Sequence, residues 1–219
     1  MMWEWNQAVI RGVLREDPCY SHCQYGEDFY LLEMGVARAS GTWDVLRVML
    51  SQRLMVEELP QAGEWMEIRG QLRSYNRMET GRSKLQLMVF AGEARRAVES
   101  EGFCNRVELE GLICRQPHYR ATPLGREICD LMLAVSRSYH RCDYIPCILW
   151  GRNARYMGRM GIGRRIRING RIQSREYIKM ENGLPIHRVT IEVSAVTGQL
   201  VEEIDNCQEM GYITNNNDS

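Results

Sequence analysis

Residues 143–151, DYIPCILWG, place two aromatic side chains on the strand face that would ordinarily meet water. The apolar residues of period two, which predict the core-facing side, are Ile145, Cys147 and Leu149. The opposite side would carry Tyr144, Pro146, Ile148 and Trp150. Exposed rings can stack on nucleic-acid bases of any sequence, and each stacked base is worth about 1–3 kcal/mol. The alternative is that these aromatics are ordinary residues of a barrel surface or of an interface.

The charge distribution favours an anionic ligand for the part of the chain that contains this stretch. The whole chain has 28 basic and 28 acidic residues. Residues 1–100 carry 12 Lys and Arg against 14 Asp and Glu, residues 101–200 carry 16 against 9, and residues 201–219 carry none against 5. The middle segment is therefore a basic module followed by an acidic tail. Lys84 and Lys179 are the only lysines, and arginine is the residue that binds phosphate in bidentate fashion and stacks on bases.

The chain contains an internal repeat. NQAVIRGVLRED at 6–17 resembles NRVELEGLICRQ at 105–116, DVLRVML at 44–50 resembles DYIPCIL at 143–149, and GEWMEIRGQLRS at 63–74 resembles GRRIRINGRIQS at 163–174. Three blocks in the same order predict a tandem duplication, joined by a polar stretch at 92–102. We therefore expect a first domain over 1–92, a second over 104–200, and a flexible acidic tail over 201–219.

Each copy is expected to consist mainly of strands. In the second copy, residues 143–149 are joined by four more alternating apolar sets: Val107, Leu109 and Ile113; Leu131, Leu133 and Val135; Ile166, Ile168 and Ile172; and Val189, Ile191 and Val193. A helix is expected only around 152–160, between the third and fourth of these five strands. Gly111 and Gly170 fall inside strand patterns, where glycine usually marks a bulge or a bend. This pattern predicts an all-β protein of two tandem OB-folds, which are five-stranded Greek-key barrels, with a five-stranded sandwich as the alternative.

The second copy resembles the bacterial single-stranded DNA-binding proteins over roughly residues 105–200. The resemblance rests on NRVELEGLICRQP, TPLGREICDLMLAVSRSY, DYIPCILWGRNA and GRRIRINGRIQSREY, followed by an NG turn. The first of these segments is also similar to the primosomal replication-restart protein, a single-domain member of the same group. The first copy looks like a diverged member of the family.

The resemblance implies four base-stacking aromatics and a track of cations beside them. The aromatic positions are Tyr139, Tyr144, Trp150 and Tyr177. The flanking basic residues are Arg137, Arg141, Arg152, Arg175 and Lys179, and outward positions of the fourth strand add Arg165, Arg167 and Arg171. These cations would neutralise phosphates, which would make binding salt-dependent.

The first copy keeps the expected core residues but loses the aromatic positions. Ser40, Val45 and Ser51 stand where the second copy has Tyr139, Tyr144 and Trp150. The retained apolar residues are Ile10, Leu14, Met66, Ile68, Leu72, Leu85, Leu87 and Val89. We expect this domain mainly to scaffold or to oligomerise. Trp3 and Trp5 precede its first strand and are expected at a packed edge or subunit contact, since a bare pair would form an apolar patch.

The resemblance also implies an assembly. The family commonly arranges four OB-folds around the nucleic acid, so two folds per chain imply a homodimer with closed two-fold symmetry. Its tail usually ends in an acidic tip with an apolar last residue that recruits replication and repair proteins. Here the acidic cluster is followed by GYITNNNDS with no terminal Phe, so the resemblance does not extend to that tip.

Several other classes of function have little support in the sequence. Neither a signal-peptide pattern nor a membrane span is present, and eight cysteines without such a signal are expected to be reduced thiols in the cytoplasm. Cys19, His22 and Cys23 lack a second ligand pair, so we expect no metal and no cofactor. The basic module lacks clustered carboxylates, a phosphate-binding glycine loop and a Ser/His/Asp grouping, so we do not expect the protein to be an enzyme.

The sequence therefore favours a non-enzymatic, largely sequence-independent binder of single-stranded DNA in replication, repair or recombination. The alternative is a primosome-type or mobile-element OB-fold protein that acts mainly through protein–protein contacts.

Overall fold

The computed structural model describes residues 5–55, 58–79, 82–122, 124–138, 141–181 and 184–201. The expected tail, apart from Val201, lies outside these ranges, as do Trp3 and Tyr139. The described chain is mostly β-strand, as expected. Within it, no helix is long and apolar enough to cross a membrane.

The described residues of the first half form six strands: β1 (Asn6–Leu14), β2 (Cys19–Gln24), β3 (Glu27–Ala37), β4 (Trp43–Ser51), β5 (Trp65–Glu79) and β6 (Arg82–Arg96). Five of them close a ring in which β1 pairs with β3 and β5, β3 pairs with β4, β5 pairs with β6, and β4 runs parallel to β6. Strand β2 extends β3 outside this ring, and a single 3-10 turn, η1 (Gln52–Leu54), follows β4. The last strand continues to Arg96, past residue 92.

The second half repeats this pairing order. Its strands are β7 (Cys104–Ile113), β8 (His118–Ala121), β9 (Glu127–Ser136), β10 (Cys142–Trp150), β11 (Arg165–Glu181) and β12 (Leu184–Leu200). Strand β7 pairs with β9 and β11, β9 with β10, β11 with β12, and β10 runs parallel to β12. Strand β8 extends β9, and the helix α1 (Gly151–Met157) lies between β10 and β11.

The expectation of five strands per half was wrong, because β2 and β8 were missed. Every residue of β2 is exposed, and β8 is exposed at three of its four residues. A short strand outside the ring buries neither face, so its sequence lacks the apolar alternation from which strands are predicted.

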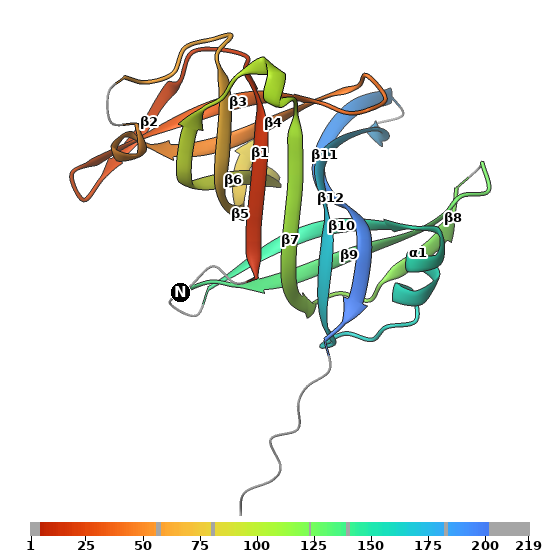
Figure 1. The fold of residues 1–219 in the computed structure, drawn as a ribbon. Helices are drawn as coiled ribbons and strands as arrows, with labels where there is room; N and C mark the ends of the chain where they lie inside the picture. Colours follow the sequence, from red (N-terminus) through yellow and green to blue (C-terminus); the bar gives the residue numbers. More distant parts are fainter. Residues whose placement is uncertain are drawn as a thin grey trace, which may run out of the picture.

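The two rings are joined edge to edge. Strand β1 pairs antiparallel with β7, with Ala8 opposite Val107, and this pair runs through the centre of the molecule in Figure 1. The register is symmetric, because Asn6 pairs with Leu109 and its repeat partner Asn105 pairs with Ile10. The two copies are therefore related to each other much as the subunits of a two-fold dimer are.

The buried residues match most of the apolar sets expected from the sequence. Both rings are filled by their inward side chains, including Ile10, Met66, Leu109 and Ile168, all fully buried. Three expected core residues differ: Leu85 and Ile191 are half-buried, and Val189 is exposed. The reason for Val189 and Ile191 is that the β11–β12 hairpin continues beyond the part of β12 that pairs with β10, Val193–Ser194.

Candidate nucleic-acid interface

Strand β10 exposes an aromatic side chain at each end, as expected, but a residue between them on the same face is buried. Ile145, Cys147 and Leu149 are buried in the core, and Tyr144 and Trp150 are 50% and 38% exposed. Ile148, expected on the outer face with them, is only 1% exposed, and this expectation was wrong. It pairs with β9 on one side and β12 on the other, so it lies on an interior strand of the ring. The two aromatics are thus separate exposed rings rather than the ends of one open face.

The orientation of Trp150 is set by its neighbours. Its indole Nε1 donates a hydrogen bond of 3.3 Å to Ser194 Oγ on β12. The chain then turns into α1 through Gly151, whose φ of 56° favours glycine. The bond to Ser194 holds the ring while leaving part of it open, as a stacking surface requires.

Three expected site residues are described incompletely or not at all. Tyr139 lies outside the described residues. Tyr177 and Lys179 belong to β11, where they pair with Arg188 and Ile186 of β12, but their side chains lie outside the described part. Their roles stay predictions.

The expected arginines fall into two groups. Arg141, Arg152 and Arg171 are exposed, and none of them makes an ion pair with a residue in the described ranges. Arg141 precedes β10, and Arg152 follows Trp150 in α1, so each lies close in the chain to an exposed aromatic. These guanidinium groups are available to an anionic ligand.

The other arginines are bound to carboxylates. Arg175 pairs with the buried Glu192 at 2.9 Å, and Arg137 pairs with Asp143 at 3.4 Å. Arg165 and Arg167 both reach Glu110 on β7, at 3.5 and 2.8 Å.

Arg167 also contacts the ring of Trp5. Its guanidinium carbon lies 3.4 Å from the centroid of the Trp5 ring, which is a cation–π contact. Trp5 is therefore packed against the second half, although 43% of its surface stays exposed. The outward arginines of β11 therefore do not form one continuous track. Arg165 and Arg167 face the join between the halves, whereas Arg171 is exposed without an ion pair to a described residue.

A reciprocal clasp between the halves was not predicted from the sequence. The carboxylate of Asp143, fully buried on β10, accepts bonds from the backbone N–H and Oγ of Ser74 on β5, at 2.7 and 3.3 Å. Ser74 Oγ in turn accepts the backbone N–H of Tyr144 at 2.8 Å. In the mirrored contact, Asp44 of β4 accepts from Ser174 of β11 at 2.7 and 2.9 Å.

A signal for this clasp was present in the repeat. Asp44 and Asp143 open the same repeated block, and Ser74 and Ser174 close another. A carboxylate retained at the start of a strand in both copies needs a buried partner, because an unpaired buried charge is costly. The sequence alone did not say that each partner belongs to the other copy.

The charge of Asp44 is stabilised inside the clasp. Burial by itself would raise the pKa of this carboxyl, but hydrogen bonds from Arg38 and Ser174 outweigh it and hold the pKa below the ordinary value. Arg38 donates to both carboxylate oxygens and also to the backbone oxygen of Ser174 at 2.6 Å. The ionised carboxylate therefore belongs to the folded state.

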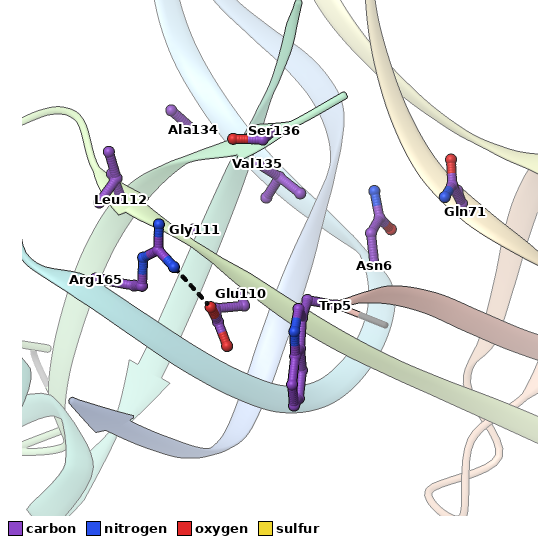
Figure 2. Close-up of a pocket in the computed structure, with 10 residues that line it drawn as sticks. All are labelled: Trp5, Asn6, Gln71, Glu110, Gly111, Leu112, Ala134, Val135, Ser136 and Arg165. Atoms are coloured by element: carbon purple, nitrogen blue, oxygen red, sulfur yellow. Dashed lines mark hydrogen bonds and ion pairs between the residues drawn. The ribbon is translucent and has the colours of Figure 1, made fainter. Parts of the chain in front are cut away.

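A groove of about 330 Å³ runs along the join of the two halves. The first half lines it with Trp5, Asn6 and Gln71, and the second half with residues 110–112, 134–136 and Arg165 (Figure 2). Ala134, on its wall, is the cross-strand neighbour of Tyr144. The groove thus adjoins one of the exposed aromatics.

The first copy has no equivalent pair of exposed aromatics on β4. Ser51 is buried and hydrogen-bonded to Glu27, and Val45 is exposed. Trp43 and Trp65 contact Phe103 with ring centroids 5.1 and 4.6 Å apart. Aromatics of the first half are therefore used to fix the connection between the halves.

Comparison with known proteins gives a consistent result. The family model "Single-strand binding protein family" matches residues 104–201. Single-stranded DNA-binding protein 3 of Listeria innocua is 31% identical over 123 residues, which are 52% of this chain and 74% of that protein. Single-stranded DNA-binding protein 1 of Staphylococcus aureus is 33% identical over 84 residues, 35% of this chain and 50% of its own. The chain spans about half the length of the Staphylococcus aureus protein and of two other curated relatives that it matches.

The whole chain also has a counterpart among solved structures. A deletion mutant of the single-stranded DNA binding protein from Thermus aquaticus superimposes with a TM-score of 0.74 at 22% identity. The match covers 93% of this chain and 98% of that one, so the two proteins share the fold along nearly their full length.

Proposed function

Because the chain belongs to the single-strand binding protein family, we propose that it binds single-stranded DNA with little regard to sequence. Bases stack on Tyr144 and Trp150, and neighbouring arginines neutralise phosphates. The observation that carries this proposal is that both rings are exposed at the ends of β10, with Arg141 and Arg152 exposed close to them in the chain. The proposal assigns further stacking to Tyr139 and Tyr177 and a further phosphate contact to Lys179, on the resemblance to the family alone.

The proposal includes a division of labour between the halves. Each half, taken as 1–92 and 104–200, is an OB-fold, and the second one binds the strand. The first acts mainly as a scaffold, which is supported by its buried Ser51 at the position of Trp150. Two chains associate as a homodimer with four OB-folds. The protein performs no chemistry and serves DNA replication, repair or recombination in the cytoplasm, where replication and repair proteins are its further partners.

The test is a titration of the full chain with fluorescein-labelled dT oligomers of graded length at several salt concentrations. We expect binding that weakens steeply with salt, because each phosphate contact on a single strand contributes about 0.7 to the slope of log K against log salt. Duplex DNA of the same length serves as the control and should bind more weakly, since its bases cannot stack on the protein. Binding that is absent, or that does not change with salt, would contradict the proposal and favour a protein-binding role.

A further inference from the structure

Two clusters, each of two arginines on one carboxylate, lie at or next to the groove between the halves. In the first cluster, Arg165 and Arg167 share Glu110, as the dashed line in Figure 2 shows for Arg165. In the second cluster, Arg73 of β5 and Arg137 share Asp143, at 3.3 and 3.4 Å. Each cluster therefore carries one excess positive charge.

The cluster around Asp143 does not itself line the groove, but two of its residues adjoin residues that do. Arg73 Nη2 donates to Oε1 of Gln71, which lines the groove, and Arg137 follows the lining residue Ser136 in the chain. The side chains of Arg73 and Arg137 keep 20% and 32% of their surface exposed. The pKa of Arg73 is lowered, first by burial and then by the nearby charge of Arg137.

The repeat shows that the second arginine is not needed to build the clasp. The residue of the second half that corresponds to Arg73 is Gln173, which bonds to Glu192. Among the described residues, Asp44 is paired with one arginine, Arg38, and the clasp to Ser174 forms all the same. The excess charge is thus specific to the side of the molecule that carries Tyr144.

We propose that the groove between the halves carries the phosphate backbone of the bound single strand, with Arg73 of the first half as a phosphate contact. The strand continues from Tyr144 past its neighbour Ala134 into the groove, where the two cation clusters attract phosphates. The first half then binds DNA through charge, although it lacks the stacking aromatics on β4. This inference rests on the proposed function.

The test compares Arg73→Gln with the wild-type chain in dT binding across a salt series. Glutamine occupies the equivalent position of the other half, Gln173, so the same place in the fold already accepts this side chain. We expect the slope of log K against log salt to become shallower by about 0.7, the value of one phosphate contact. Arg53→Gln is the matched control, because Arg53 is an exposed first-half arginine paired with Glu27, away from the groove, and its loss should leave the slope unchanged.

The outcomes separate this inference from the proposed function. A wild-type chain that does not bind dT would contradict the proposed function itself. Normal binding with the same slope in wild-type, Arg73→Gln and Arg53→Gln would overturn the groove path alone. If Arg73→Gln does not fold, two other experiments test the groove path. The first is Arg73→Lys, which keeps the charge and should retain the wild-type slope. The second is photocrosslinking of a 4-thiothymidine oligomer to the wild-type chain, which should label the segment 71–73. A shallower salt slope in Arg73→Lys, or the absence of a crosslink in segment 71–73, would also overturn the groove path.

Discussion

At the residue scale, exposure on β10 depends on which neighbours flank the strand at each point. Tyr144 and Trp150 lie at its two ends and stay open, while Ile148 on the same face is buried where β12 joins the ring. Trp150 is further oriented by Ser194. The stacking surface therefore depends on a few side chains, each of which can be tested alone.

Removing one ring should remove one stacked base. We expect Trp150→Ala to weaken dT binding by about 1–3 kcal/mol while the fold survives, because the core of β10 is formed by Ile145, Cys147 and Leu149. Anisotropy of a labelled oligomer measures the affinity without relying on the deleted indole. Tyr144→Ala and Val45→Ala form a matched pair across the repeat, in which the first should weaken binding and the second should not. Equal losses in the pair would argue against a stacking surface confined to the second half.

The buried carboxylate Asp44 should make stability depend on pH in acid. Its folded pKa is lowered, so its contribution is fully present above the unfolded value of about 3.9 and is lost as pH falls through the folded pKa. We expect the urea midpoint to drop as the pH falls from about 4 through the folded pKa, and Asp44→Asn to be less stable above that range with a smaller drop within it. The same pH dependence in both proteins would mean that other carboxylates dominate it.

At the scale of elements, the long strands bend at glycines that no other residue can replace without distortion. Strands β5 and β11 each shift register at a bulge, at Gly70 and at Gly170. A Cβ on Gly70 would lie 2.1 Å from the backbone oxygen of Phe90, and a Cβ on Gly170 would lie 2.3 Å from that of Ser194. The bulge predicted at Gly170 is confirmed.

Gly170→Ala should therefore destabilise the second half. We expect a loss of about 1–3 kcal/mol in the free energy of unfolding, because the new methyl group must displace backbone rather than a flexible side chain. Gly161→Ala is the control, since a Cβ there meets nothing within 4 Å. Urea unfolding of the two variants measures the difference, and equal stabilities would show that the strand can relax at the bulge.

At the scale of the whole molecule, the two copies are built into each other. The β1–β7 pairing and the two Asp–Ser contacts, Asp44 with Ser174 and Asp143 with Ser74, all cross between them. Each copy therefore supplies an edge and a buried hydrogen-bond partner that the other lacks on its own.

The second half produced alone should pair with itself. Residues 104–200 would expose the edge of β7, and a symmetric β7–β7 pairing would bring Arg106 opposite Glu108 while Asp143 of one copy reaches Ser174 of the other. We expect light scattering to give a dimer of this fragment, with Asp143→Ala weakening the association. A stable monomer would show that the contacts between the halves are not needed for folding.

The sequence by itself determined the duplication, the inward residues of most strands and the two exposed aromatics of β10. These features follow from repetition and from the period-two rule, which need no knowledge of distant contacts. Short exposed strands such as β2 carry no such pattern and were missed.

Only the tertiary structure decided which residues of one copy meet the other. It buried Ile148, bound Arg165 and Arg167 to Glu110, and brought Arg73 of the first half to Asp143 beside Tyr144. The physical reason is that a charge or an outer-face residue has no fixed partner along the chain. Its partner is determined only when β1 pairs with β7 and the two rings come into contact. This strand pairing brings together residues that are far apart in the sequence.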